Sequence, residues 1–281
     1  MIMAGKLYLC ATPIGNLDDI TFRVVDTLKN VDLIAAEDTR HTIKLLNHYD
    51  IKTKMTSYHE HNKYEKAEVL VAELLKGTNI ALVTDAGTPG ISDPGEELVK
   101  QALAAGIEVT SLPGPAALIV AVSMCGLSSR RFVFEGFLPT VKKERREALA
   151  RLENETRTIV IYEAPHRILK TLKDLQEVLG DREIRICREL TKVHESVLAI
   201  TIADAIKLYE ENEPKGEMVV VIKGKDEEEI AQEERASWEE MSVKDHVEHY
   251  MQQGLSEKDA MKQAARDRGL SKRDIYDEIK K

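Results

Sequence analysis

The sequence predicts an α/β protein with two α/β domains, a cleft between them, and a small C-terminal three-helix module. Short apolar segments alternate with amphipathic helical patterns over residues 1–115, which is typical of a parallel sheet covered by helices. Residues 116–225 hold further strand candidates, several of them too closely spaced for crossover helices, which indicates hairpins and a mixed sheet. Residues 242–281 contain three Ser-x-x-Asp motifs, each a signal for the start of a helix.

The first region is expected to contain five strands, with its clearest helix between the third and the fourth. The strands are predicted at residues 6–11, 31–36, 54–57, 79–84 and 108–111. The helix is predicted at 62–76, because Ala67, Leu70 and Leu74 fall on one face and Gly77 follows its end. Pro113-Gly114-Pro115 then predicts a hinge between the two regions.

The second region is expected to contain five more strands, followed by an acidic segment and three short helices. The strands are predicted at residues 131–134, 158–162, 183–190, 197–201 and 217–223. Residues 226–241 are strongly acidic and are expected to form a linker or an exposed helix. The helices that follow are compatible with a helix-turn-helix-like module, in which Lys272 and Arg273 would face nucleic acid. A packing or dimerisation appendage is the alternative.

Composition excludes several classes of protein. A formal net charge of -9 gives no support for non-specific binding to nucleic acid. Cys10, Cys125 and Cys187 are scattered, so we expect reduced core residues and neither disulfides nor a zinc site. The histidines lack metal-ligand spacing, and no G-x-S-x-G motif indicates a serine hydrolase. Without a signal peptide pattern or a bilayer-length apolar stretch, we expect a cytoplasmic protein with no membrane association.

The segment DAGTPGISDPG at residues 85–95 is the most informative in the chain. It follows the fourth expected strand, where open α/β sheets bind ligands, and Asp93 is expected to cap the helix that starts at Pro94. Its spacing matches neither common phosphate-binding motif, and it contains no lysine. Asp85 at its entrance favours ribose hydroxyls or a cation over a pyrophosphate. A plain strand–helix connection is the alternative.

Other polar clusters follow other expected strands: TPIGNL at 12–17, AEDTRH at 36–41, YEAPHR at 162–167 and PKGE at 214–217. The loops after the first, second and fourth strands should share one sheet edge and form a cleft. Glu37, Asp38 and Arg40 could instead simply cap a helix and pair with one another. The basic run Lys142, Lys143, Arg145 and Arg146 is expected on an exposed helix face, where it is the best local candidate for phosphate contacts.

Together, the segments 12–20, 36–40, 85–95, 113–116, 162–167 and 215–217 resemble the tetrapyrrole methylase superfamily, over roughly residues 6–225. Within it, the chain is similar to the enzymes that methylate small-subunit ribosomal RNA. The resemblance implies a homodimer that uses S-adenosylmethionine as the methyl donor. It would methylate the ribose 2′-hydroxyl of a cytidine in the decoding centre of 16S rRNA. The expected partner is this rRNA in the small ribosomal subunit.

S-adenosylhomocysteine would be the product that remains after transfer. The resemblance also implies which residues would bind the methyl donor. They are Pro13, Asp85, Ala86, Gly87, Thr88, Ile91, Ser92, Pro113, Gly114 and Ala116 in the first part, and Tyr162, Leu190 and Glu217 in the second. A sulfonium donor carries a positive charge and no phosphate, which agrees with an acidic, lysine-free loop.

A ribose hydroxyl is a poor nucleophile, so we expect Glu37 or Asp38 to take or orient its proton. Arg40 and Arg167 are expected to hold RNA phosphates, and the basic run at 142–146 and the C-terminal module are expected to grip RNA. Two other functions stay open at this stage. One is a methylase of a corrin or porphyrin precursor, and the other is a ligand-sensing protein that binds nucleic acid through its C-terminal helices.

Overall fold

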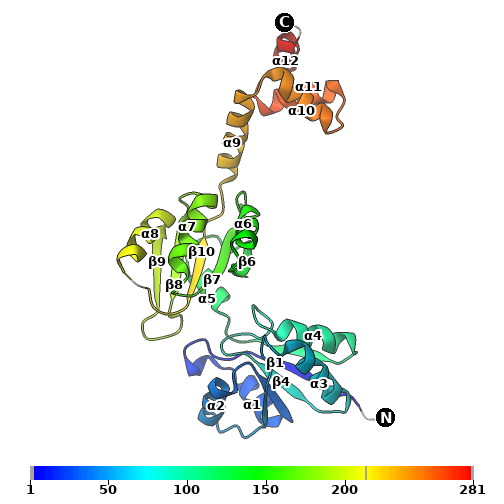
Figure 1. Cartoon of the computed structure of the whole chain (residues 1–281), viewed down its shortest axis with the longest axis vertical. Helices are drawn as coiled ribbons and strands as arrows, with labels where there is room; N and C mark the ends of the chain where they lie inside the picture. The colour runs from blue at the N-terminus through cyan, green and yellow to red at the C-terminus, as the bar shows by residue number, and fades with distance from the viewer. Residues whose placement is uncertain (1–2, 213, 280–281) are drawn as a thin grey trace. The chain divides into compact units, whose positions relative to one another are not determined.

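The computed structural model describes residues 3–212 and 214–279. It divides into two compact units (Figure 1). The first unit comprises Met1–Leu152 and Arg157–Lys223, and it contains two five-stranded sheets. The second comprises Glu153–Thr156 and Gly224–Lys281, and it is helical.

The first sheet is parallel and has the strand order β3-β2-β4-β1-β5. Its strands are β1 (Leu7–Cys10), β2 (Leu33–Ala36), β3 (Met55–Ser57), β4 (Ile80–Val83) and β5 (Val109–Leu112). Its helices are η1 (Leu17–Asp19), α1 (Phe22–Asn30), α2 (Thr39–His48), α3 (Lys63–Leu75) and α4 (Gly95–Ala104). We call this sheet and its helices the first lobe. All five strands expected from the sequence are present, with ends that differ by a few residues.

Both faces of the first sheet are buried, which explains why its strands read as continuous apolar runs. On one face, Leu9 and Leu82 pack with Leu70 of α3 and Leu98 of α4. On the other face, alternate residues of the same strands pack against α1 and α2. Because the strands are parallel and covered by helices, their carboxyl ends all open at one edge, as the sequence predicts.

The second sheet is mixed and has the strand order β6-β7-β10-β8-β9. Its strands are β6 (Phe132–Phe137), β7 (Thr158–Glu163), β8 (Glu183–Arg188), β9 (Ser196–Thr201) and β10 (Met218–Ile222). Its helices are α5 (Ala117–Met124), α6 (Lys142–Ala150), α7 (Ile168–Leu179) and α8 (Ile202–Glu211). We call this the second lobe. Only β6 and β7 pair in parallel, so the expected hairpins and mixed sheet are confirmed.

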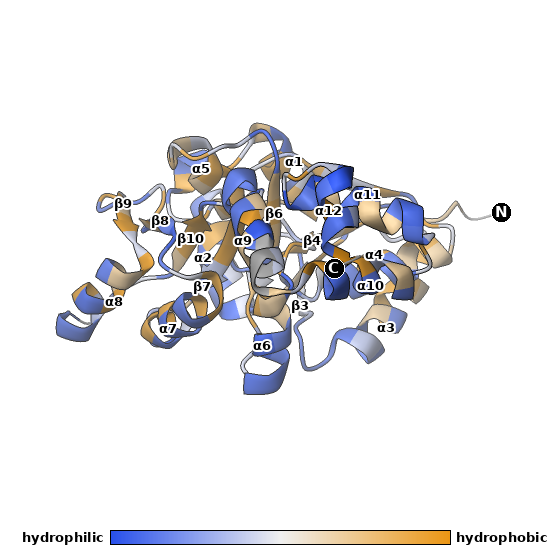
Figure 2. Cartoon of the chain, turned by 90° about the horizontal axis from the view of Figure 1, so that it is seen from above, coloured by the Kyte–Doolittle hydropathy of each residue, from blue (hydrophilic) through white to orange (hydrophobic). Residues whose placement is uncertain are grey.

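Helices cover both faces of the second sheet. Helix α5 packs on one face through Leu118 and Val122. On the other face, α6, α7 and α8 bury an aliphatic cluster that includes Leu149, Leu172 and Ile206. The amphipathic character of α7 and α8 is visible as alternating hydrophobic and hydrophilic residues along each ribbon (Figure 2). The predicted fold class is therefore confirmed.

A β-bulge interrupts β6 close to its end. The pairing of β6 with β7 shifts register between Phe134 and Gly136, and Gly136 has a φ of +62°. A Cβ on Gly136 would lie 2.7 Å from Oγ of Ser92, so only glycine allows this strand to approach the loop of the first lobe so closely. Bulges often redirect a side chain next to a functional site, and here the next residue is Phe137.

The helical unit contains α9 (Glu227–Glu240), α10 (Val243–Gln252), α11 (Glu257–Asp267) and α12 (Lys272–Ile279). The acidic segment is thus a helix, one of the two forms expected for it. The side chains of Ser242, Ser256 and Ser271 accept hydrogen bonds from the third residue after each, as the Ser-x-x-Asp motifs predict. A small core of its own, including Val247, Met261 and Ile275, holds the module together.

The cysteines, the hydropathy of the helices and the potential metal ligands can each be examined in the structure. Cys10, Cys125 and Cys187 are free and buried, and burial raises the pKa of Cys10 and of Cys187 to about 12. Among the described residues, no helix combines the length and hydropathy needed to cross a bilayer. Within the same part of the chain, no group of three or more His, Cys, Asp or Glu could hold a metal ion.

Candidate active site

A cavity of about 310 Å³ opens at the carboxyl edge of the first sheet, where the first lobe meets the second. Its first wall comes from the loops that follow β1, β2 and β4. Two backbone hydrogen bonds between Thr12 and Gly87, of 2.9 and 3.0 Å, join the first and third of these loops. These bonds fix the loops after β1 and β4 relative to one another.

The loop at residues 85–95 is held by its own hydrogen bonds. The Asp93 carboxylate accepts from the backbone N–H groups of Gly90, Ile91 and Gly95. Ser92 has a φ of +61°, a conformation that non-glycine residues adopt rarely. Helix α4 begins at Gly95, one residue later than predicted, because Asp93 is engaged mainly with the turn before it. Such a loop presents a fixed backbone to whatever occupies the cavity.

Two carboxylates lie side by side on this wall, Glu37 at the end of β2 and Asp85 at the end of β4. Oε2 of Glu37 accepts from the Thr84 hydroxyl at 2.6 Å and from the Asp85 N–H at 3.3 Å. Burial raises the pKa of Asp85, and the neighbouring negative charge of Glu37 raises it further. Within the described residues, Oε1 of Glu37 makes no hydrogen bond, which leaves this oxygen available to a ligand.

Asp38 does not line the cavity. Its carboxylate caps α2 by accepting from the Arg40 N–H, and it also pairs with the Arg40 guanidinium at 2.7 Å. Hydrogen bonds from Arg40 hold the pKa of Asp38 well below its ordinary value. A carboxylate held ionised in this way is a weak proton acceptor, so Asp38 is poorly suited to act as a base. The helix-capping alternative considered for Asp38 and Arg40 describes their contacts.

Aromatic residues form the opposite wall, in the second lobe. The rings of Phe137 and Tyr162 are 5.5 Å apart in an edge-to-face arrangement, and the Phe134 ring lies 4.9 Å from that of Tyr162. The Tyr162 hydroxyl accepts a hydrogen bond from the Leu118 N–H at 3.1 Å, which fixes the ring relative to α5. Burial raises the pKa of Tyr162, so this hydroxyl stays neutral.

The segment after β8 closes a third side of the cavity through Glu189, Leu190 and Lys192. Nζ of Lys192 lies 3.0 Å from the Glu189 carboxylate, so the one lysine on the described cavity wall is paired with an acid. Gly15 of the first lobe sits against this segment. A Cβ on Gly15 would lie 2.8 Å from the Leu190 carbonyl oxygen and 2.6 Å from Cγ of Lys192.

Most residues expected to bind the donor line this cavity. They are Asp85, Ala86, Gly87, Thr88, Ile91, Ser92, Ala116, Tyr162, Leu190 and Glu217. The other three do not line it. Pro13 lines a smaller neighbouring cavity, and Pro113 and Gly114 lie in the connection after β5. A Cβ on Gly114 would be 2.6 Å from Cβ of Ala11, so this glycine is required by packing in the structure.

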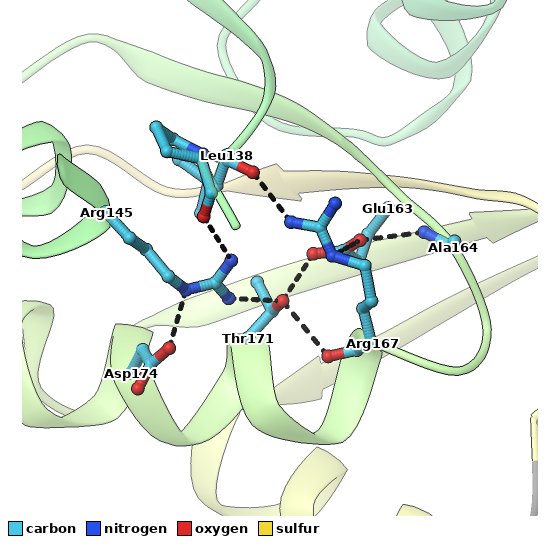
Figure 3. A network of polar contacts seen from close by, with 8 residues as sticks. Leu138, Arg145, Glu163, Ala164, Arg167, Thr171 and Asp174 are labelled. Atoms are coloured by element: carbon cyan, nitrogen blue, oxygen red, sulfur yellow. Dashed lines mark hydrogen bonds and ion pairs between the residues drawn. The ribbon is translucent and has the colours of Figure 1, made fainter. Parts of the chain in front are cut away.

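The expectation that Arg145 lies on an exposed helix face is wrong. Arg145 is buried, and its guanidinium donates to Asp174 at 2.6 Å, to the Thr171 hydroxyl at 2.5 Å and to the Pro139 carbonyl (Figure 3). It occupies the face of α6 that also carries Ala148 and Leu149, which pack into the core of the second lobe. A guanidinium that is 3% exposed and has three internal partners is not available for phosphate contacts at the surface.

Arg167 belongs to the same network and is half-buried. It donates to the Leu138 carbonyl at 2.6 Å and lies 3.3 Å from the buried Glu163 carboxylate (Figure 3). Glu163 also accepts from the Thr171 hydroxyl and from the Ala164 N–H. The two arginines thus tie the Leu138–Pro139 turn to α7, directly after Phe137 of the cavity wall. The structure gives Arg167 an internal role, in contrast to the expected phosphate contact.

The remaining residues expected to bind RNA are exposed. Lys142, Lys143 and Arg146 lie on the outer face of α6, where Arg146 pairs with Glu177 at 2.7 Å. Lys272 and Arg273 lie in the first turn of α12. Arg40 is exposed and neutralised by Asp38. These positions are open to a partner, and their role stays a prediction.

Residues 6–206 match the model of the family described as Tetrapyrrole (Corrin/Porphyrin) Methylases. The chain belongs to the tetrapyrrole methylase family. A solved structure of this fold, the uroporphyrin-III-C-methyltransferase from Thermus thermophilus, superposes with a TM-score of 0.56 over 77% of this chain and 94% of that one. At 18% identity it shows the fold alone.

Two curated relatives are far more similar in sequence. A protein of Halalkalibacterium halodurans named ribosomal RNA small subunit methyltransferase I is 50% identical over 97% of this chain and 93% of its own length. A protein of the same name from Synechocystis is 51% identical over 97% of this chain and 96% of its own length. The similarity therefore includes the helical unit as well as the two sheets of the tetrapyrrole methylase.

Several residues that line this cavity are not predicted from the sequence. Phe137 follows a bulge that no periodic pattern reveals, and Glu189 and Lys192 lie in a segment with no turn motif. Glu189 and Thr191 both have positive φ values without being glycine, a backbone feature invisible in the sequence. Glu163 belongs to the YEAPHR segment, and nothing in that segment indicates that it lines the cavity and is fully buried.

Proposed function

We propose that the chain transfers the methyl group of S-adenosylmethionine to the 2′-hydroxyl of a cytidine in the decoding centre of 16S rRNA. The observation that carries this proposal is the sequence identity of 50–51%, over 97% of the chain, to proteins named ribosomal RNA small subunit methyltransferase I. The ribose position, the cytidine and the decoding centre are the finer parts of the proposal, and they come from the motif resemblance described above.

The cavity suits the methyl donor in size and charge. Its volume of about 310 Å³ falls within the range of small-molecule sites. Glu37, Asp85 and Glu217 contribute negative charge, and a cation is also attracted by aromatic rings such as those of Phe137 and Tyr162. When bound, S-adenosylmethionine supplies an electrophilic methyl group on a cationic sulfur. The chain would hold it with the backbone of the 85–92 loop on one side and Tyr162 and Leu190 on the other.

The proposed role of Glu37 is to accept the proton of the ribose hydroxyl as the new O–C bond forms. Its Oε2 is already occupied by Thr84 and Asp85, and its Oε1 faces no described partner. Glu37 and Asp85 lie together on the cavity wall, where an acceptor hydroxyl can reach Glu37. Positioning of the two reactants contributes the rest of the acceleration.

The test measures transfer of a labelled methyl group from S-adenosylmethionine to three acceptors: small ribosomal subunits, protein-free 16S rRNA and a porphyrin precursor. We expect label in rRNA, in a nucleotide that resists alkaline hydrolysis at its 3′ side because its 2′-oxygen is methylated. Label in the porphyrin precursor alone would support the tetrapyrrole alternative. Donor binding with no transfer to any acceptor would favour a ligand-sensing protein.

We include the homodimer in this proposal, as the resemblance implies, with the small ribosomal subunit as the partner. Sedimentation of the purified chain at several concentrations is expected to give twice the mass of 31.6 kDa calculated for one chain. A single species at the monomer mass throughout the concentration range would contradict this part of the proposal and leave the chemistry unaffected.

The contact between Gly15 and the segment after β8 gives a prediction for donor binding. In Gly15→Ala the added methyl group meets the Leu190 carbonyl, and backbone atoms there have little freedom to move away. We expect the Kd for S-adenosylhomocysteine, measured by calorimetry, to rise about tenfold, which is about 1.4 kcal/mol. Gly126→Ala is the control, because Gly126 has no atom within 4 Å of its Cβ position. Its φ of +72° disfavours alanine, which is not so at Gly15, so any effect of backbone strain falls on the control. Equal affinities for the two variants would contradict the prediction.

A further inference from the structure

A second, smaller cavity of about 210 Å³ lies next to the donor cavity and has no role in the function described so far. It is formed by the loop after β1, helix α2 and the end of β4. The two cavities share Thr84 and Asp85 as lining residues. They therefore meet beside the Glu37 and Asp85 carboxylates, where the proposed reaction needs the acceptor hydroxyl to be.

Three cationic or ionisable side chains of α2 line this second cavity: His41, Lys44 and His48. Their spacing of three and four residues places them in a row along one face of the helix. All three are exposed, and none is in an ion pair with a described residue. Arg40, one residue earlier, differs because Asp38 already neutralises it.

The charges that face this row are few among the described residues. Asp85 is the acidic residue in the lining, and His41 lies close enough to lower the pKa of Asp85. Glu37 and Asp38 lie close to Asp85, since the negative charge of each raises its pKa, and Asp38 is paired with Arg40. Asp18 in η1 acts on Tyr49, the residue that follows α2. The outer part of the row is thus a local positive surface on a chain whose net charge is -9.

Three further lining residues are apolar, and the threonines in the lining are buried. Pro13 and Leu17 come from the loop after β1, and Leu45 comes from α2 between Lys44 and His48. A surface that combines flat apolar contact with a row of cations suits a nucleotide, whose base is apolar on its faces and whose phosphates are anionic. A purely ionic ligand would not need the apolar side.

We propose that this second cavity binds the acceptor nucleotide of the RNA substrate. Its ribose lies at Thr84 and Asp85, so that the 2′-hydroxyl reaches Glu37 and the mouth of the donor cavity. Lys44 and His48, with His41, contact the phosphates that flank this nucleotide, and Pro13 and Leu17 contact its base. This inference depends on the proposed function for the identity of the reaction, but it makes a separate claim about where RNA binds.

The geometry also accounts for the position of Pro13. Resemblance placed Pro13 in the donor site, whereas it lines the second cavity. A residue of the loop after β1 can serve both ligands because Ile14, its neighbour, lines the donor cavity. The loop after β1 then separates the two reactants and fixes their distance.

The test introduces acidic residues into this row in the full-length chain. The variants are Lys44→Glu and the double variant K44E/H48E. Lys100→Glu in α4 is the control, because it makes the same change of charge on the same lobe at an exposed position. Binding to small ribosomal subunits and to a 16S rRNA fragment is measured over a range of salt concentrations, separately from turnover. Calorimetry with S-adenosylhomocysteine reports on the donor cavity.

We expect the Kd for RNA to rise about tenfold or more in Lys44→Glu, and the slope of log K against log salt to fall by about one. Lys44→Arg is expected to restore both, and donor affinity is expected to stay unchanged in every variant. RNA affinity and salt slope equal to those of Lys100→Glu would overturn the inference even if the chain methylates RNA. Loss of RNA binding in K44E/H48E would support it even if methyl transfer went to another acceptor.

Discussion

Glu37→Gln is expected to reduce the single-turnover rate of methyl transfer by about 10²–10⁴-fold, the range that a general base contributes. Glutamine keeps an oxygen that can accept from Thr84 and from the Asp85 N–H, so the loop at residues 85–95 should keep its position. What glutamine removes is the capacity to take a proton from the acceptor hydroxyl. The affinity for S-adenosylhomocysteine is therefore expected to change little.

Asp38→Asn is the matched control for this prediction, because Asp38 is the adjacent acid and does not line the cavity. Its carboxylate already pairs with Arg40, and an asparagine can still cap α2. We expect its rate to stay within a few-fold of the natural chain. If Glu37→Gln transferred methyl groups as fast as Asp38→Asn, neither residue would be the base, and Asp85 would be the next residue to replace.

Arg145→Ala is expected to destabilise the first unit by about 3–5 kcal/mol, the cost of removing one member of a buried ion pair. Arg145 is buried and has Asp174, Thr171 and the Pro139 carbonyl as partners (Figure 3). Its removal leaves these groups without a donor in a site that water does not reach easily. The free energy of unfolding, measured in urea, would show the loss.

Arg146→Ala is the natural comparison, because Arg146 lies on the same helix, is exposed, and forms only a surface pair with Glu177. Surface pairs contribute about 0–1 kcal/mol, so this variant should be nearly as stable as the natural chain. Arg145→Lys should recover part of the loss, since an ammonium can reach Asp174 but not all three partners at once. Equal stabilities of Arg145→Ala and Arg146→Ala would show that the network contributes nothing.

Local pattern was sufficient for the elements of the fold. The strands of the first lobe are buried on both faces, so each one reads as an apolar run. Their alternation with helices indicated that neighbouring strands run parallel. The capped helices of the second unit were visible for a similar reason. A Ser-x-x-Asp motif satisfies backbone donors within one turn, and no distant residue takes part.

Local pattern was insufficient for Arg145 and Arg167. The basic run places Arg145 on an exposed face, whereas in the fold it is bound to Thr171 and Asp174 of α7. Arg167 is expected to hold RNA phosphates, whereas in the fold it is bound to the Leu138 carbonyl and to Glu163. The face of α6 that holds Arg145 also holds Ala148 and Leu149, and this apolar spacing was the one available signal of burial. In a basic run on a helix, a basic residue spaced three or four residues from apolar ones is therefore expected on the buried face.

The sequence by itself determined the fold class, the order of the elements and the sheet edge at which the loops of the donor site meet, because strand direction and local capping depend on residues close together in the chain. Only the tertiary structure decided which charged groups face the cavity. It separated Glu37 from Asp38, placed Pro13 in the second cavity, and added Phe137 and Lys192. Those outcomes depend on burial and on contacts between residues far apart in sequence, and such contacts leave no periodic signal in the chain.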